Sequence, residues 1–124
     1  MLRLSNLKIS LLGVAASLPL TVNAANCFST EWKPYNGVYN DAWSTRSSLC
    51  TNGANGVNCN TDNTFCAVTA GNVVATWEGS DKNGMFAQCW DALNDAINQC
   101  VYSNKPGGDY EYNGNTWTVT VLAE

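Results

Sequence analysis

The clearest hydrophobic pattern in the chain predicts an amphipathic helix over residues 85–102. Apolar side chains recur there at spacings of three and four, which places them on one face of a helix. They are Phe86, Cys89, Trp90, Leu93, Ala96, Ile97, Cys100 and Val101. Asp81 or Asn83 can cap the start, and Pro106-Gly107-Gly108 prevents continuation past the end. We therefore expect a helix that is buried along one side, with Trp90 in the core.

Two cysteines on this predicted helix restrict how the chain can be cross-linked. Cys89 and Cys100 are eleven residues apart, so they share a face and lie about 16 Å apart along the axis. A disulfide needs Cα atoms within about 7 Å of each other, so these two cannot form one. Each must join the helix to a different part of the chain.

Residues 64–78 show the period-two pattern of a strand. Val73, Ala75 and Trp77 fall on one face, which we expect to be buried, and Gly71-Asn72 predicts a bulge or a tight turn that divides the region.

Residues 109–123 predict a hairpin, because Asn113-Gly114 suits a type I′ turn with positive φ at both positions. In the resulting register Tyr112 faces Asn115 and Tyr110 faces Trp117. The face expected to lie under a helix carries Tyr110, Tyr112, Trp117, Val119 and Val121. The polar face carries Asp109, Glu111, Thr116, Thr118 and Thr120.

The remaining segments complete an α+β fold. Residues 40–50 predict a first helix, with Arg46 at its edge and four core side chains, Ala42, Trp43, Leu49 and Cys50. Residues 26–37 suggest an irregular arm or short strand, and residues 54–63 a surface loop. The order favours a small, disulfide-stapled α/β sandwich. We expect an antiparallel sheet of three or four strands, ending in the C-terminal hairpin, with two helices packed on it.

The N-terminal region predicts a secretory signal peptide over residues 1–24. Arg3 and Lys8 form a basic start, and the apolar run that follows is too short to span a bilayer. Small residues then permit cleavage after Ala24, with Ala25 as the alternative. We expect residues 25–124 to form a single secreted, cysteine-rich domain.

All six cysteines follow the predicted signal, and in an exported chain of this size they predict three disulfides. Six cysteines allow fifteen pairings, of which twelve remain once the pair within the helix is excluded. The absence of a CxxC motif argues against a redox pair, and the absence of histidine against a zinc site. The cysteines are Cys27, Cys50, Cys59, Cys66, Cys89 and Cys100.

Charge and composition exclude several functions. Removing Arg3 and Lys8 with the signal leaves four basic and ten acidic residues, a net charge of −6. Such a surface repels nucleic acid and offers no basic patch to a membrane, so we expect neither nucleic-acid binding nor membrane insertion.

The side chains also argue against catalysis and metal binding. A chain without histidine lacks the commonest acid–base and nucleophile-activating group. A paired-carboxylate glycosidase stays possible, but Asp91 with Asp95 and Asp109 with Glu111 are expected on the surface. Residues 58–62 resemble the opening of a calcium loop, yet the required glycine and glutamate are absent. We expect a non-enzyme without a cofactor or metal.

Glycan binding is the favoured interpretation. Sugars are bound by flat aromatic faces together with a few polar groups, and the chain is rich in Trp, Tyr, Asn and Thr. Trp32 and Tyr35 are the aromatic residues expected to be exposed. Asp109, Glu111 and Thr118 are the polar candidates on the free face of the hairpin.

Cys27-Phe28, Cys50 at the end of a helix, and CWDALNDAINQC followed by Pro-Gly-Gly and an aromatic hairpin together resemble small secreted fungal proteins. The family most similar in these features is that of mushroom glycan-binding proteins, lectin-like single domains with an α/β sandwich. This resemblance implies a fungal source, extracellular action and binding to an extracellular glycan or cell-surface glycoprotein. It assigns no sugar-contacting residue, and the ending at residues 121–124 departs from the Asp-Pro-Asn type of tail in that family.

A second resemblance is to fungal killer toxins of the α/β-sandwich type, although these are typically basic and this chain is acidic. A secreted effector that acts on a host is a related alternative. Fold alone does not decide among the three. The sequence therefore predicts a secreted, non-catalytic, glycan-binding protein, with a fungal effector or killer-toxin-like protein as the alternative.

Overall fold

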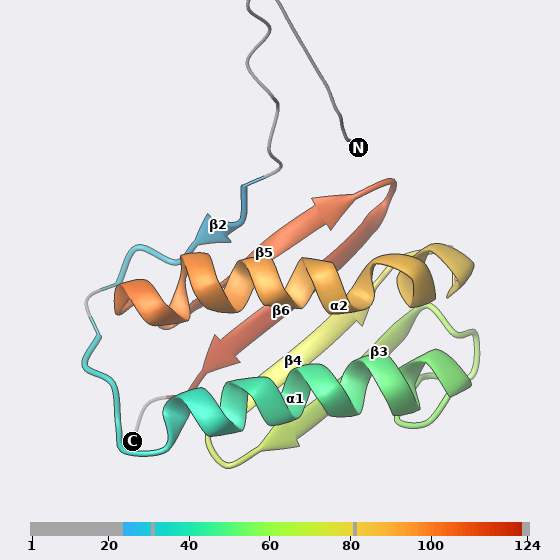
Figure 1. Ribbon diagram of the computed structural model, residues 1–124. Coiled ribbons are helices and arrows are strands. Elements are labelled where there is room, and N and C mark those ends of the chain that lie inside the picture. Colours follow the sequence, from blue (N-terminus) through green and yellow to red (C-terminus); the bar gives the residue numbers. More distant parts are fainter. Residues whose placement is uncertain (1–23, 31, 81, 123–124) are drawn as a thin grey trace, which may run out of the picture.

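The computed structural model describes residues 24–30, 32–80 and 82–122. The protein is an α+β sandwich in which two helices cover one face of a five-stranded antiparallel sheet (Figure 1). The helices are α1 (Val38–Asn52) and α2 (Lys82–Gln99), with short 3₁₀ turns η1 (Gly53–Asn55) and η2 (Val101–Ser103). The strands are β2 (Asn26–Cys27), β3 (Phe65–Ala70), β4 (Val73–Glu78), β5 (Gly107–Tyr112) and β6 (Asn115–Val121). Residues 1–23 lie outside the described part, so the signal peptide stays a prediction.

The predicted fold class is confirmed, with five strands in place of the three or four expected. The strand order is β2-β5-β6-β4-β3, and neighbouring strands are antiparallel. The additional strand is β2, whose two residues pair with β5 opposite Asp109 and Gly108. A strand of two residues is too short to show an alternating pattern, so the sequence could not distinguish a short strand from an irregular arm in this segment. Gly71-Asn72 forms the predicted tight turn, with Gly71 at a φ of 57°.

The C-terminal hairpin has the predicted register. Tyr112 pairs with Asn115 and Tyr110 with Trp117. Asn113 and Gly114 have φ values of 51° and 79°, as a type I′ turn requires.

The core lies between the sheet and the two helices. Trp77 and Trp117 are directly opposed on β4 and β6, and both are fully buried. Alternate positions of the same two strands add Val73, Ala75, Val119 and Val121. The helices contribute apolar residues at helical spacing, including Val38, Ala42, Leu49, Met85, Leu93, Ala96 and Ile97.

Two aromatic residues expected in the core lie at the surface, with an exposed fraction of 38 % for Trp90 and 37 % for Tyr112. Trp43 and Tyr110 are half-buried and pack against the core, in agreement with the prediction. Trp90 lies at the margin of the buried stripe of α2, where α1 presents Arg46 and not an apolar side chain. Tyr112 is the last residue of β5, next to the turn.

The limits of the helices also differ slightly from the predicted ones. α2 ends at Gln99, and the chain continues as the 3₁₀ turn η2. Asn83 lies inside α2 and therefore does not cap it, while Asp81 lies outside the described residues.

All six cysteines are paired, which confirms the three predicted disulfides. Cys27–Cys100 joins β2 to the residue after α2, Cys50–Cys89 joins α1 to α2, and Cys59–Cys66 fastens the loop before β3. The helix is thus connected to two different parts of the chain, as its cysteine spacing predicts. No helix within the described ranges combines the length and apolar character needed to cross a membrane.

Candidate ligand-binding surface

Trp32 and Tyr35, expected as exposed aromatics, are half-buried parts of the segment that leads into α1. The Tyr35 hydroxyl donates to the Asp41 carboxylate at 2.7 Å and accepts from the backbone N–H of Asn72 at 3.3 Å. Trp32 packs against the hydrophobic core. Both rings are therefore less exposed than expected, and the Tyr35 hydroxyl connects the segment to the β3–β4 turn and to α1.

Asp109, Glu111 and Thr118 lie together on the sheet face that α1 and α2 leave free, as predicted. Asp109 pairs with Thr118, and Glu111 with Thr116, so these side chains share one face. The Asn26 amide donates to Asp109 at 3.4 Å. We call this surface the open face. Its strand residues are Asn26, Phe65, Ala67, Thr69, Val74, Thr76, Glu78, Asp109, Glu111, Thr116, Thr118 and Thr120.

The five predicted ligand-binding residues do not form one site. Tyr35 contacts Asn72, which precedes the first residue of β4. Glu111 is level with Glu78, the last residue of β4, through Thr116. The length of that strand, about 17 Å at about 3.3 Å per residue, therefore separates the aromatic candidates from Glu111.

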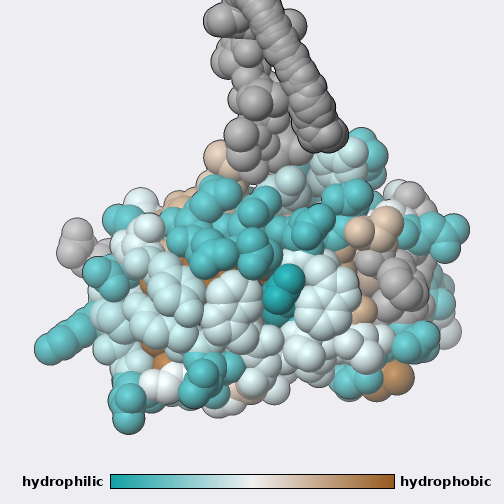
Figure 2. Space-filling model, in the orientation of Figure 1, coloured by the Kyte–Doolittle hydropathy of each residue, from teal (hydrophilic) through white to brown (hydrophobic). Residues whose placement is uncertain are grey.

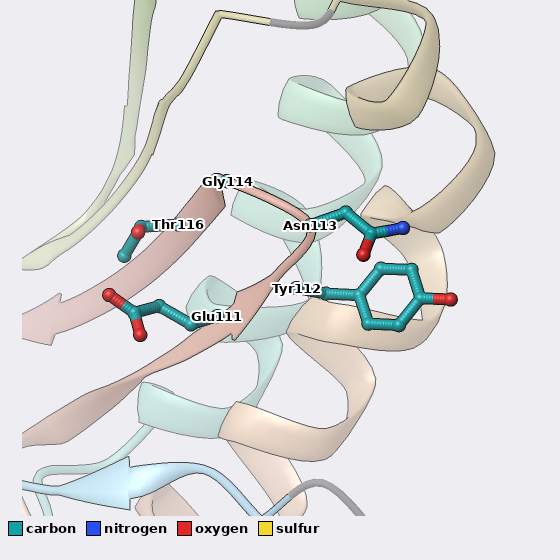
Figure 3. Close-up of a pocket in the computed structure, with 5 residues that line it drawn as sticks. All are labelled: Glu111, Tyr112, Asn113, Gly114 and Thr116. Atoms are coloured by element: carbon teal, nitrogen blue, oxygen red, sulfur yellow. The ribbon is translucent and has the colours of Figure 1, made fainter.

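A shallow hollow of about 340 Å³ surrounds the tip of the C-terminal hairpin. Its lining side chains project in two directions (Figure 3): Glu111 and Thr116 to one side of the ribbon, Tyr112 and Asn113 to the other. The aromatic ring and the carboxylate therefore lie on different sides of the hairpin tip.

A larger group of surface aromatics lies on the outer side of the helix layer. We call it the aromatic strip. It consists of Tyr39, Trp43 and Arg46 of α1, Trp90 of α2 and Tyr102 of η2. Figure 2, which has the orientation of Figure 1, shows ring-shaped side chains of intermediate hydropathy side by side over the helices, with a strongly hydrophilic one between two of them.

The rings at one end of the aromatic strip are held by one another. Tyr39 and Tyr102 are stacked, with centroids 4.2 Å apart and planes inclined by 11°. The Trp43 indole N–H donates to the Tyr102 hydroxyl at 2.9 Å, and their ring centroids are 6.1 Å apart. Tyr102 is nevertheless 45 % exposed, while Tyr39 and Trp43 are half-buried and pack against the core.

Arg46 connects this cluster to Trp90. Its guanidinium carbon lies 5.4 Å from the Trp43 ring centroid and 4.8 Å from that of Trp90, which is cation–π distance. Its Nε donates to the Trp90 carbonyl at 2.9 Å. Within the described ranges Arg46 contacts these two rings and this carbonyl, so its terminal amino groups keep donor capacity for a ligand.

The support beneath the aromatic strip is covalent. Cys50 at the end of α1 is bonded to Cys89 of α2, the residue before Trp90. Leu49 and Leu93 are fully buried beneath the helices. The two helices that carry the rings therefore cannot separate, and the rings are preorganised for binding.

Sequence reasoning missed the aromatic strip because it placed the exposed Trp90 in the core and considered only the core-facing side of Trp43. One pattern could have revealed it. Tyr39, Trp43 and Arg46 are spaced four and three residues apart, so they form one stripe on α1. An arginine in such a stripe is typical of a surface and not of a core.

Among the carboxylates, Asp95 on α2 has a raised pKa. Partial burial raises its pKa above the ordinary value of 3.8, the charge of Asp91 raises it further, and a hydrogen bond with Asn94 lowers it. No cluster of three or more His, Cys, Asp or Glu side chains suited to a metal ion lies in the described part of the chain.

Comparisons with known proteins identify the fold. Neither a protein-family model nor a curated protein matches the sequence. Among solved structures, the tandem DUF26 ectodomain of the Arabidopsis thaliana cysteine-rich receptor-like protein PDLP8 is similar, with a TM-score of 0.58 and 8 % identity. The alignment covers 82 % of this chain and 47 % of that one.

The corresponding ectodomain of PDLP5, also from Arabidopsis thaliana, gives a TM-score of 0.44 and 20 % identity over 82 % of this chain and 48 % of that one. The chain thus spans about half the length of each ectodomain. The likeness to PDLP8 shows that the fold is that of a DUF26 ectodomain unit. The resemblance to fungal glycan-binding proteins and killer toxins stays a prediction.

Proposed function

We propose that this chain is a secreted, non-catalytic binding domain that binds glycans through the aromatic strip. The observation that carries the proposal is the row of partly exposed rings with a guanidinium between two of them. Flat aromatic faces pack against the C–H faces of sugars, and adjacent N–H and O–H groups bond to sugar hydroxyls. The aromatic strip supplies both kinds of group within one preorganised surface.

The chemistry of the aromatic strip supports binding and not catalysis. Its polar groups are phenol hydroxyls, indole N–H groups and one guanidinium. The chain has no histidine, the commonest general acid or base. Asp109 and Glu111 project from the opposite side of the molecule, on the open face.

Secretion is supported by the predicted signal peptide and by the three disulfides, which persist in oxidising compartments. Two of them close long loops, with sequence separations of 73 and 39 residues. Cross-links of this kind stabilise a small domain outside the cell.

The test is an immobilised glycan array probed with the refolded protein in its disulfide-bonded form. The unmodified chain should bind at least one class of glycan, and Trp90→Ala should lose that binding. Tyr112→Ala is the matched control, because its ring is exposed to nearly the same extent, 37 % against 38 %, but lies at the hairpin tip. It should bind normally.

Absence of binding to every glycan at high micromolar concentration would contradict the proposal and favour the effector or toxin alternative. Equal loss in both variants would argue against the aromatic strip as the binding surface.

A further inference from the structure

The dimensions and charge of the aromatic strip bear on the kind of glycan it binds, an inference that rests on the proposed function. Successive groups along it are separated by 6.1 Å from Tyr102 to Trp43, 5.4 Å from Trp43 to Arg46 and 4.8 Å from Arg46 to Trp90. The guanidinium lies over both indoles and Tyr102 adjoins Trp43, so the groups form one continuous surface with several aromatic rings. A single sugar could cover only part of it, whereas a chain of sugars could contact Trp43 and Trp90 together.

Arg46 lies where a sugar chain would pass between the two indoles. Its Nε is occupied by the Trp90 carbonyl, which fixes the plane of the guanidinium. The terminal amino groups are then the donors that remain for a ligand. They can donate to hydroxyls on neighbouring sugars, because a planar fork presents two parallel N–H groups.

The charge of the chain argues against a polyanionic ligand. Without the predicted signal peptide the net charge is −6, and Arg46 is the basic residue of the aromatic strip. Asp91 follows Trp90 directly, and Asp95 lies one turn further along α2. A sugar chain with repeated carboxylates or sulfates would be repelled by this surface.

We infer that the ligand is an unbranched, uncharged glycan chain that lies along the aromatic strip and spans Trp43 and Trp90, with Arg46 donating to sugar hydroxyls between them. Arg46 would then be a specificity-determining residue, since it contributes hydrogen bonds that an apolar side chain of similar length cannot replace. The rings would contribute contact area that grows with the number of sugars bound.

The experiment is a calorimetric titration with uncharged β-linked oligosaccharides of one to six units, taken from cello-, chito- and manno-oligosaccharides. Oligogalacturonates of the same lengths serve as the charged series, and both series are measured at 50 and 500 mM NaCl. For one uncharged series, affinity should rise at least tenfold from the monosaccharide to the tetrasaccharide and change less than twofold with salt.

Two outcomes would overturn this inference while leaving the proposed function intact. One is tighter binding of the oligogalacturonates with a marked loss at high salt, as expected if Arg46 pairs with a carboxylate. The other is a monosaccharide that binds as tightly as the longer chains. If no member of either series binds and the glycan array is also blank, the proposed function fails as well.

Arg46 is tested with two variants that differ in what they retain. Arg46→Lys keeps the charge but loses the planar fork, and Arg46→Met keeps most of the apolar stem. Both should weaken binding of the favoured tetrasaccharide at least threefold, with Arg46→Met the weaker binder. Thermal melting monitors the contact between α1 and α2. Unchanged affinity in both variants would overturn the role assigned to Arg46.

Discussion

The helix layer and the open face of the sheet are both surfaces of the same sandwich, yet their side chains differ in kind. The outer side of the helices gathers four aromatic rings and one guanidinium into the aromatic strip. The strand residues of the open face are mainly Thr, Asp and Glu, with one aromatic ring, Phe65, on the edge strand β3. The open face has the plainer sequence pattern, because strand alternation alone predicts it. The aromatic strip is nevertheless the surface whose side chains can stack on a ligand.

The two surfaces also differ in how the chain supports them. Cys50–Cys89 cross-links the two helices directly beneath the aromatic strip. The open face depends on strand pairing across five strands, with Cys59–Cys66 at one edge and Cys27–Cys100 joining β2 at the other edge to the residue after α2. A change that separates the helices should therefore damage the aromatic strip first.

The largest effect is expected from removing the cross-link between the helices. Cys50→Ser with Cys89→Ser opens a loop with a sequence separation of 39 and should lower the free energy of unfolding by about 4 kcal/mol. Cys59→Ser with Cys66→Ser opens a separation of only 7 and should cost about 2 kcal/mol. Denaturant unfolding of both double variants measures the difference. Equal losses of stability in the two double variants would contradict the claim that Cys50–Cys89 stabilises the protein more than Cys59–Cys66.

The next effect concerns the turn where the sheet meets the helix layer. Gly71 has a φ of 57°, and a Cβ there would overlap the Asp41 carboxylate that Tyr35 holds. Gly71→Ala should therefore cost about 2–3 kcal/mol of stability. Gly114→Ala, at a φ of 79° with nothing within 4 Å, should cost only the backbone strain of about 1 kcal/mol. Unfolding curves for both variants test this, and equal costs would mean that Asp41 moves away freely.

A smaller effect is expected on glycan affinity, which should respond to substitutions on the aromatic strip but not on the open face. Tyr102→Ala removes a ring that is 45 % exposed and should weaken glycan binding about tenfold, or about 1.4 kcal/mol. Tyr102→Phe keeps the stacking ring and should lose less. Thr118→Ala on the open face should change the dissociation constant less than twofold. A larger loss for Thr118→Ala than for Tyr102→Ala would reverse the assignment of the surfaces.

The smallest effect is a pH dependence carried by α2. Because the pKa of Asp95 is raised in the folded protein, the folded state binds the proton more tightly than the unfolded state. The contribution of the Asp95 carboxyl to folding stability is therefore greatest below pH 3.8, and it falls as the pH rises through the raised pKa. Asp95→Asn should melt slightly above the unmodified chain at pH 7 and equally at pH 3.

Melting temperatures across this range measure the effect, with the exposed loop variant Asp62→Asn as the control. A difference for Asp95→Asn that stays constant from pH 3 to pH 7 would contradict the assignment.

Much of the fold could be predicted from local pattern. Asn113-Gly114 fixed the hairpin register because its turn type admits one pairing. The spacing of Cys89 and Cys100 required two separate connections for α2, and the structure has both. Which cysteines they bond depends on tertiary packing, and the spacing left twelve pairings open.

The candidate site was less predictable, for physical reasons. Trp90 matches the apolar rhythm of α2, but burial at the margin of a helix depends on what the neighbouring helix presents, and α1 presents Arg46. Trp32 and Tyr35 lie in a segment without periodicity, where burial depends on tertiary contacts: Tyr35 bonds to Asp41 and Asn72, and Trp32 packs against the core. The outward positions of Asp109 and Thr118 followed from strand alternation alone.

The most direct test of the aromatic strip is an NMR titration of the indole N–H signals with the favoured oligosaccharide. The chain has five tryptophans, in three different settings. Trp43 and Trp90 belong to the aromatic strip, Trp77 and Trp117 are fully buried, and Trp32 lies in the segment before α1. The signals of Trp43 and Trp90 should shift with ligand while the other three stay in place. Shifts confined to Trp32, or perturbation of the open-face amides without either strip indole, would contradict it.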